Sequence, residues 1–393
     1  MHKYWKILIL ILFTLGILLG LIQRNNLPDF SFGSNTTIKY FATPSEDSLA
    51  GYYQKSKEIS ESTSQPISKI SFLAVGDIML SRNVAGTIIK SGNINLPFGN
   101  IANLLKSTDF NFGNLESPVS PTKPIIGGHS LIFGTSEELL SGLKTYNFNV
   151  LNLANNHTLD QGLVGIKTTI STLDQLGIKH TGAGENLKDA WTPAIIERNG
   201  IKICFVGASY SSINDGGQVK NDYVARIDDI KNLKLQITNS KLLCDFVVAT
   251  MHAGTEYTRT PNQAQKDFAH TAIDAGADMA IGAHPHWIQT IEKYNEKYIF
   301  YSLGNFIFDQ EWSKETKEGL TLKIQISKEQ TSNSLTPGAA TMSDLQGPRT
   351  PAKVESIELI PIIIENYSTP RPATTEEAKK ILQTIGEKDS LLK

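Results

Sequence analysis

Six short apolar runs between residues 70 and 305 each end in a cluster of polar residues that are common ligands. Short apolar runs with such boundaries are typical of buried strands, and helical spacing between several of them predicts an α/β fold. In α/β folds ligands collect at the carboxyl ends of the strands, so we expect one site there. The polar residues that follow the runs are Asp77, Asn114, Glu116, Asn155, Asn156, His157, His252, His284, His286 and Asn305.

The segments between and after these runs have their own patterns. Apolar residues recur at steps of three and four over 163–176 and predict a helix that stops at Gly177. Another helix is expected from Pro261 to Ala275, with Gly276 as its stop. Four further segments are predicted: a strand over 320–326 that alternates as an exposed strand does, a loop over 328–352, a strand over 354–364, and a helix over 375–385 capped by Thr374 or Thr375.

The N-terminal region predicts the compartment. The uncharged run Ile7–Ile22 follows Lys3 and Lys6, which is typical of a membrane helix whose N-terminus stays cytoplasmic. A cleaved signal peptide is the alternative, but the residues after the run offer no small-residue cleavage site. We therefore predict an anchor over residues 1–24, a Ser/Thr-rich tether over 25–69, and an extracytoplasmic domain over 70–393.

Charge and cysteine content exclude some classes of protein. A net charge of −2 gives no general attraction for nucleic acid, so no nucleic-acid partner is expected and any anion must bind a local site or a metal. The two cysteines, Cys204 and Cys244, exclude a disulfide scaffold. We interpret them as two buried small hydrophobic residues; a disulfide between neighbouring strands is the alternative, which spacing does not decide.

Four histidines follow apolar runs, together with two acidic residues in matching positions. Burying so many ionisable groups without a cation would carry a large desolvation cost, so we predict a metal site. The ligand set consists of imidazole, carboxylate and amide oxygen, with no thiolate. Such a set suits one or two divalent ions such as Mn, Fe, Zn or Mg. Glu116 is the best candidate for a bridging carboxylate. Asp160 either orients His157 or caps the following helix.

Taken together, the motifs resemble the CapA family of poly-γ-glutamate (capsule) synthesis proteins, a branch of the calcineurin-like metallophosphoesterase superfamily. The resemblance covers residues 70–310 and keeps the family's order of motifs. The matching segments are GDIMLSR at 76–82, NLESPV at 114–119, NLANNHTLDQG at 152–162, HAGTEY at 252–257, GAHPHW at 282–287 and SLGNFIFDQ at 302–310.

The resemblance implies a four-layer α/β/β/α sandwich and assigns roles to the motif residues. Asp77 and His286 would hold a first metal, and Asn156, His252 and His284 a second, with Glu116 in the place of the bridging aspartate. His157 would be the acid or phosphate-contacting histidine, with Asp160 as its catalytic companion. Substrate contacts are expected from Arg82, Asn114, Glu256, Tyr257 and Asn305.

One departure from the superfamily pattern bears on catalysis. The first motif has Met79 where the related phosphoesterases usually have a histidine, and a neutral thioether is a poor ligand for a hard cation.

Three functions follow. The leading one is a single-pass membrane protein of poly-γ-glutamate or capsule synthesis or export, with an anionic polymer, the membrane and other capsule-synthesis membrane proteins as partners. The alternatives are a metal-dependent hydrolase of an envelope phosphoester or amide, and a non-catalytic module that binds an anionic polymer.

Overall fold

Two β-sheets organise the protein, and in this computed structural model residues 67–128, 130–211, 221–329, 351–387 and 391–392 are described. The first sheet has the order β14-β13-β12-β1-β2-β3-β4. Its strands β1 to β4 run parallel, whereas β12, β13 and β14 are antiparallel additions. The bounds are β1 Ile67–Ile78, β2 Phe110–Leu115, β3 Phe148–Asn152, β4 Lys179–Thr181, β12 Glu318–Glu329, β13 Lys353–Glu365 and β14 Thr369–Pro372. The short strands β11 (Asn305–Ile307) and β15 (Leu391–Leu392) pair with β1 and β13.

The second sheet has the order β5-β6-β7-β8-β10-β9. Its four central strands are parallel and its two edge strands, β5 and β9, are antiparallel to their neighbours. Parallel strands need crossover connections, and α8 and α9 supply them after β6 and β7. The bounds are β5 Ala194–Arg198, β6 Ile201–Ser209, β7 Phe246–His252, β8 Met279–Ala283, β9 Ile291–Tyr294 and β10 Lys297–Phe300.

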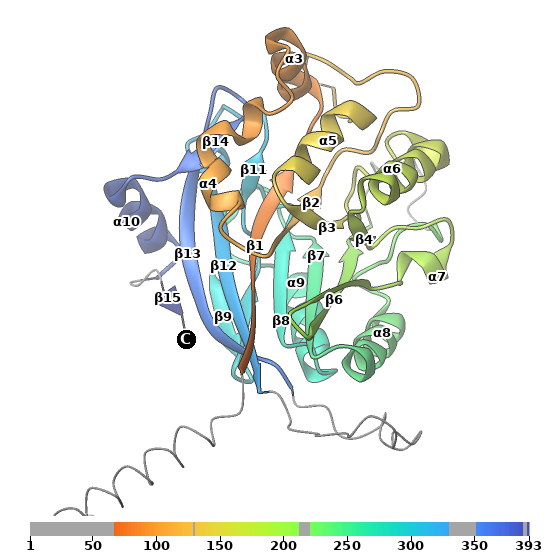
Figure 1. The fold of residues 1–393 in the computed structure, drawn as a ribbon, viewed down its shortest axis with the longest axis vertical. Helices are drawn as coiled ribbons and strands as arrows, with labels where there is room; N and C mark the ends of the chain where they lie inside the picture. The colour runs from red at the N-terminus through yellow and green to blue at the C-terminus, as the bar shows by residue number, and fades with distance from the viewer. Residues whose placement is uncertain (1–66, 129, 212–220, 330–350, 388–390, 393) are drawn as a thin grey trace, which may run out of the picture. The chain divides into compact units, whose positions relative to one another are not determined.

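The helices belong to the connections between the strands (Figure 1). The longer ones are α3 Arg82–Ser91, α5 Glu137–Thr145, α6 Gly162–Leu176, α8 Ile230–Leu243, α9 Gln263–Asp274 and α10 Thr375–Thr384. The shorter helical segments are η1 Leu96–Ile101, α4 Ala102–Leu105, α7 Leu187–Ala190 and η2 Glu315–Lys317. The alternation of strand and helix predicted from the sequence is therefore present, and the fold is of the mixed α/β class.

Aromatic side chains from both sheets pack in one buried cluster. Phe205 of the second sheet contacts Phe72, Phe110 and Phe112 of the first, with ring centroids 4.9–6.1 Å apart. A second cluster joins the first sheet to α3 and α5, and a third joins the second sheet to α8 and α9. Burial of these apolar side chains therefore holds the two sheets together. Apolar burial is the largest favourable term in folding.

The expected helix boundaries are confirmed. Gly177 ends α6 in the left-handed conformation, with φ of 64°. A capping box at Asn262 starts α9 just after Pro261, and Thr374 forms a second capping box with Glu377 at α10. The prediction of an exposed strand over 320–326 is wrong. The apolar residues of β12 are buried in the cluster shared with the second sheet, and on its other face Thr321 is buried while Lys323 and Gln325 are half-buried.

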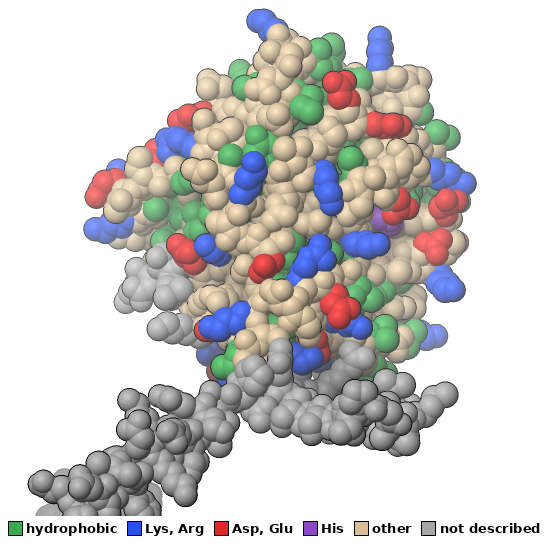
Figure 2. Space-filling model, viewed as in Figure 1, with side chains coloured by type: hydrophobic (Ala, Val, Ile, Leu, Met, Phe, Trp, Pro, Cys, Tyr) green, Lys and Arg blue, Asp and Glu red, His purple; other side chains and the backbone are tan. Residues whose placement is uncertain are grey.

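Strand β1 starts at Ile67, inside the segment assigned to the tether. The anchor over 1–24 and most of the tether lie outside the described residues. Within the part of the chain that the structure describes, no helix is long and apolar enough to cross a membrane. Figure 2 shows acidic and basic side chains interspersed on one face of the domain.

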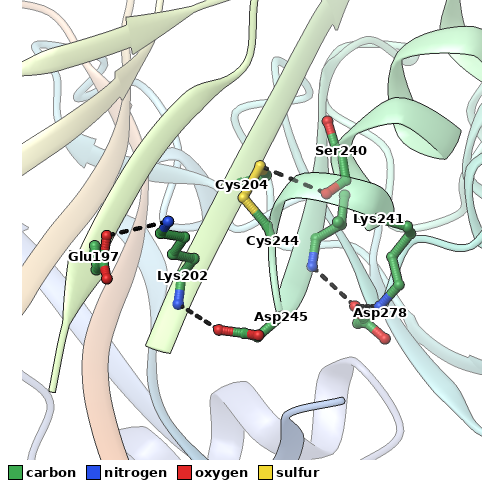
Figure 3. Close-up of a disulfide and its surroundings, with 9 residues drawn as sticks. Glu197, Lys202, Cys204, Ser240, Lys241, Cys244, Asp245 and Asp278 are labelled. Carbon is green, nitrogen blue, oxygen red and sulfur yellow. Dashed lines mark hydrogen bonds and ion pairs between the residues drawn. A yellow bond between two sulfur atoms is a disulfide. The ribbon is translucent and has the colours of Figure 1, made fainter. Parts of the chain in front are cut away.

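Cys204 and Cys244 form a disulfide, so the preferred interpretation of two separate buried thiols is wrong (Figure 3). Cys204 lies in β6, and Cys244 follows α8 just before β7, the parallel neighbour of β6. This crossover brings the two Cα atoms to 5.9 Å, inside the range that a disulfide requires. Spacing along the chain does not reveal that proximity, because it depends on strand order.

Candidate metal centre

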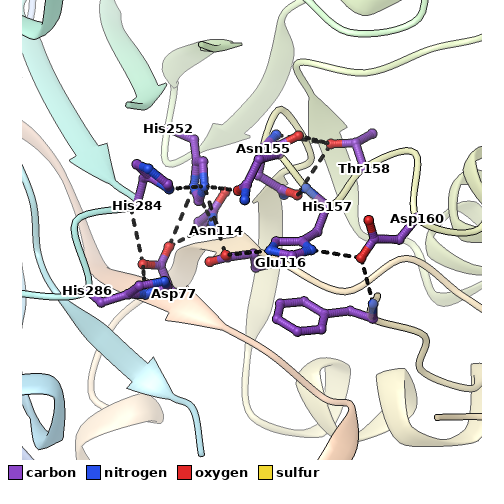
Figure 4. Close-up of polar contacts among 12 residues, drawn as sticks. Asp77, Asn114, Glu116, Asn155, His157, Thr158, Asp160, His252, His284 and His286 are labelled. Carbon is purple, nitrogen blue, oxygen red and sulfur yellow. Dashed lines mark hydrogen bonds and ion pairs between the residues drawn. The ribbon is translucent and has the colours of Figure 1, made fainter. Parts of the chain in front are cut away.

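The predicted ligand residues meet where the carboxyl ends of both sheets come together (Figure 4). Asp77 lies near the end of β1 and Glu116 directly follows β2, its parallel neighbour. His252 is the last residue of β7, and His284 directly follows β8. Parallel pairing places these chain ends at one edge of each sheet. The site is therefore a consequence of strand order rather than of any one loop.

Three side chains form the most compact group. One ligand atom each from Asp77, Glu116 and His252 lies within 4.8 Å of the others, and all three residues are buried. The imidazole of His252 lies between the carboxylates. Its Nδ1 is 3.7 Å from Asp77 Oδ1, and its Nε2 is 3.9 Å from Glu116 Oε1.

Further ligand atoms converge on His252 Nε2. Asn156 Oδ1 lies 2.7 Å from this nitrogen and His284 Nδ1 lies 3.1 Å from it. With Glu116 Oε1 at 3.9 Å, these atoms place an amide oxygen, a second imidazole and a carboxylate around His252 Nε2. This set includes the three residues expected at the second metal and the expected bridging carboxylate.

His286 lies on the other side of Asp77. Its Nδ1 is 3.5 Å from Asp77 Oδ2 and 2.9 Å from Asn305 Oδ1. The Asn305 amide donates to Gln310 and to the Thr316 carbonyl, and these two hydrogen bonds fix its orientation. Asn305 is predicted to contact substrate, and in the structure its bonds fix the His286 ring.

Burial strongly perturbs the ionisable groups of the centre. Burial raises the pKa of Glu116 well above its usual value, and the neighbouring Asp77 carboxylate raises it further. Burial also lowers the pKa values of His252 and His284 well below the usual range, and the other imidazoles add to the shift. Neutral imidazoles are the form that binds metals.

The residues fit a divalent cation. Neither carboxylate oxygen of Glu116 has a hydrogen-bond partner among the described residues, although both are buried. An unpaired buried acceptor is costly, and a cation in contact with it would remove that cost. The surrounding nitrogen and oxygen donors, with no thiolate, suit Mn, Fe, Zn or Mg.

His157 is held by a separate set of contacts. Its Nδ1 lies 2.7 Å from Asp160 Oδ2, which also accepts the Phe133 N–H at 2.6 Å. The Phe133 ring stacks on the imidazole at 3.8 Å. His157 Nε2 faces Glu116 Oε1 at 3.7 Å. Of the two interpretations of Asp160, the structure has the one in which it orients His157; the N-cap of α6 is Gln161.

Arg82, predicted to contact substrate, makes several contacts within the protein. Its guanidinium pairs with Asp309, donates to the Ser130 carbonyl, and lies over the Phe133 ring at 4.7 Å. Its backbone has a φ of 49°, uncommon for a residue with a side chain. Asn114 is also occupied: its Nδ2 donates to Asp77 Oδ1 and lies 3.1 Å from His252 Nδ1.

Glu256 and Tyr257 lie at the outer side of the centre. Glu256 is exposed, and Tyr257 is half-buried with its ring 6.0 Å from that of His286.

Met79 is fully buried in the hydrophobic cluster with Phe133 and Phe308, and its sulfur accepts the Ser81 N–H. The thioether thus has packing and a hydrogen bond within the protein.

Sequence reasoning missed the supporting residues Phe133, Asp309 and Asn152. Phe133 comes from an irregular loop with no motif, and Asn152 donates to Asn114 Oδ1 from the next strand. Asp309 lies inside the motif at 302–310, so its charge was a signal that could have found it. Their function is to hold other side chains, and no spacing rule marks such residues.

The fold and the site define an α/β protein with a candidate metal centre at the joined strand ends. The family described as bacterial capsule synthesis protein PGA_cap matches residues 71–310. The chain is 31% identical to the capsule biosynthesis protein CapA of Bacillus anthracis over 287 residues, which is 70% of this chain and 69% of that protein. It is 35% identical to the PGA biosynthesis protein CapA of Bacillus subtilis over 256 residues, covering 65% and 67%. The chain therefore belongs to this family of capsule synthesis proteins.

A more distant relative is a probable polyglutamine synthesis accessory protein of Mycobacterium tuberculosis, which is 28% identical over 252 residues. The match covers 61% of this chain and 66% of that protein.

Proposed function

We propose that this protein is a membrane-anchored, extracytoplasmic component of poly-γ-glutamate or related capsule synthesis or export, with a divalent metal at its centre. The observation that carries the proposal is the buried group of Asp77, Glu116 and His252. Family membership supplies the class of process, and the ligand group supplies the means to hold an anionic polymer in a domain without net positive charge.

The side chains would divide between two positions. Asn156, His252 and His284 surround the point next to Glu116, and Asp77 with His286 lies beside it. A divalent ion held there would act as a Lewis acid and attract carboxylate or phosphate oxygens. The protein's own contribution is orientation: Asn114 and Asn305 hold Asp77 and His286 by hydrogen bonds, and the strand ends exclude bulk water from the buried group.

The disulfide supports an extracytoplasmic location. Disulfides persist in oxidising compartments and are rare in the cytosol, where thiols are kept reduced. The Cys204–Cys244 bridge is therefore in accord with an exported domain, as is the apolar run predicted to anchor residues 1–24. Protease added to intact spheroplasts should remove the domain. Protection of the domain, or a mature N-terminus near residue 25, would rule out the anchored topology.

The finer architecture is part of the same proposal. The cluster shared by the two sheets and the outer clusters formed with α3, α5, α8 and α9 support the layer order of helices, sheet, sheet and helices. That order is the four-layer sandwich implied by the family resemblance.

The deciding experiment is elemental analysis of the full-length protein purified in detergent, combined with polymer binding. We expect about one or two divalent ions per chain. We also expect a γ-linked glutamate polymer to bind, and removal of the metal with a chelator to weaken that binding. Metal-free protein with unchanged polymer binding would refute the metal part of the proposal, and absence of polymer binding would refute the capsule part.

A metal-dependent hydrolase is a second candidate, and one observation favours it. His157 is held by Asp160 and Phe133 with its Nε2 directed at Glu116, as a proton donor beside a ligand group would be. An imidazole so held could give a proton to a leaving group. Turnover of a chromogenic phosphodiester that is lost in His157→Ala while the metal is retained would support it. A wild-type protein without turnover of phosphodiesters and of γ-glutamyl amides would dismiss it in favour of pure binding.

A further inference from the structure

Three aromatic side chains connect the buried centre to the protein surface. We call Tyr257, Trp287 and Trp312 the aromatic rim. The Tyr257 ring lies 6.0 Å from His286, 6.5 Å from Trp287 and 5.8 Å from Trp312, measured between centroids. Exposure increases outward along the series, since His286 is buried, Tyr257 is half-buried and Trp312 is 63% exposed. The indole of Trp312 therefore offers an exposed apolar surface that Tyr257 connects to His286 of the candidate metal centre.

The backbone conformation of Tyr257 is unusual and is fixed by a hydrogen bond. Tyr257 adopts a left-handed conformation with φ of 60°, which is unusual for an aromatic residue, and its N–H donates to the Pro285 carbonyl. That bond ties Tyr257 to the His284–His286 turn. Strained backbone of this kind persists where the surroundings enforce it, and it clusters at binding sites. The position of Tyr257, and with it the aromatic rim, is therefore fixed relative to His286.

Basic side chains accompany the rim. The Arg259 guanidinium lies 5.3 Å from the Trp287 ring and pairs with the buried carboxylate of Glu318. Lys314 pairs with the other oxygen of Glu318, so two cations share one carboxylate. The Lys314 side chain is 67% exposed. Two acidic side chains also lie near the rim: Glu256 is exposed beside Tyr257, and Glu311, next to Trp312 in the chain, pairs with Lys317.

We propose that the aromatic rim, with Lys314, is a binding strip for the part of an anionic polymer that extends away from the metal centre, and that Trp312 is its main contact. The ligand is a chain with aliphatic or amide segments and regularly spaced carboxylates, as in γ-linked polyglutamate. Methylene and amide groups pack on the indole face, and Lys314 attracts carboxylates. The inference rests on the proposed function and extends it to a residue beyond the family match, which ends at residue 310.

The test uses the full-length protein in detergent, loaded with metal, and a synthetic γ-linked glutamate oligomer. Trp312→Ala should weaken binding by about tenfold, a typical loss for an aromatic contact at an interface. Trp312→Phe keeps an aromatic face and should restore most of the affinity. Leu242→Ala removes a side chain that is 70% exposed on α8, and should leave affinity unchanged. The metal content should stay at the wild-type value in all three variants.

Salt dependence separates the two kinds of contact. The loss in Trp312→Ala should be the same at low and high salt, whereas Lys314→Ala should weaken binding only at low salt, because screening removes its contribution. Wild-type affinity in Trp312→Ala would overturn the strip while leaving the proposed function intact. A wild-type protein that does not bind the oligomer would overturn both. Loss of metal in Trp312→Ala would also overturn the strip, since it would assign the residue to the fold.

Discussion

The backbone N–H of His284 donates a hydrogen bond to Oδ2 of Asp77 at 3.2 Å, and this bond joins the two β-sheets at the candidate metal centre. Asp77 is the last residue but one of β1 in one sheet, and His284 begins the turn after β8 of the other. His284 and His286 have φ values of 100° and 58°. Such conformations cost roughly 1–3 kcal/mol each, and the surrounding contacts must enforce them. The His-Pro-His turn thus directs the His284 imidazole to His252 and the His286 imidazole to Asp77.

Metal occupancy should depend on His252 and not on His270. His252 lies among the ligand atoms, whereas His270 lies on α9 and pairs with Glu292. In His252→Ala we expect most of the bound metal to be lost, because the imidazole at the meeting point of the donors is removed. Elemental analysis of the purified variants measures this. Equal metal content in His252→Ala and His270→Ala would contradict the assignment.

Gly76→Ala should distort the centre through the backbone. A Cβ at this position would lie 1.8 Å from the Gly304 carbonyl oxygen, which also accepts the Asp77 N–H. We expect a loss of about 3 kcal/mol in unfolding free energy, as in severe overpacking, together with loss of metal. Urea unfolding and elemental analysis measure both.

The matched control is Gly86→Ala on α3, where the nearest atom to the new Cβ is 3.9 Å away. This change should be neutral or stabilise the protein by up to about 1 kcal/mol, because alanine favours a helix over glycine. If both variants lose stability equally, close packing at Gly76 is not the cause.

Removing the disulfide should lower stability without removing the metal. The bridge closes a loop with a sequence separation of 40, and such bridges contribute about 3 kcal/mol, mainly by restricting the unfolded chain. Urea unfolding of a Cys204→Ala/Cys244→Ala double variant, compared with the oxidised and reduced wild type, gives the size of the effect.

Thiol labelling after denaturation provides the check in cells. Protein from the membrane fraction should show no reactive thiol until a reductant is added. Labelling of both cysteines without reductant would place the domain in a reducing compartment and contradict the proposed location.

The capping contact at α10 should make a small, pH-dependent contribution to the free energy of unfolding. Arg371 and the Thr374 N–H bond the Glu377 carboxylate and lower its pKa to about 2. Since the folded-state pKa lies below the unfolded value, the contribution is complete above the unfolded pKa and is lost as the pH falls toward 2. The group is partly exposed, so we expect about 1 kcal/mol or less.

Glu377→Gln should therefore be less stable than wild type at pH 7, and the difference should shrink at pH 3. Unfolding curves at both values and at two salt concentrations measure this, with Glu376→Gln in the same helix turn as the control. A difference that stays constant with pH would show that the charge of Glu377 is not involved.

Much of the local structure followed from residue patterns. The period of three and four over 163–176 predicted α6, and Gly177 marked its end because glycine adopts the left-handed conformation freely. The strand-end residues Asp77, His252 and His284 were also predicted as neighbours, since parallel strands of an α/β fold share one edge for their carboxyl ends. These inferences needed only periodicity and a general rule of topology.

Strand order, by contrast, was decided by the tertiary structure. Whether the apolar residues of 320–326 face solvent depends on the second sheet packing against β12, and whether Cys204 meets Cys244 depends on β6 lying beside β7. The contacts of Arg82 with Asp309 and of Asn305 with His286 were not predicted. The sequence by itself determined which residues are candidate ligands and where the strands that carry them end. Only the tertiary structure decided which polar groups satisfy one another, because that depends on contacts between segments far apart in the chain.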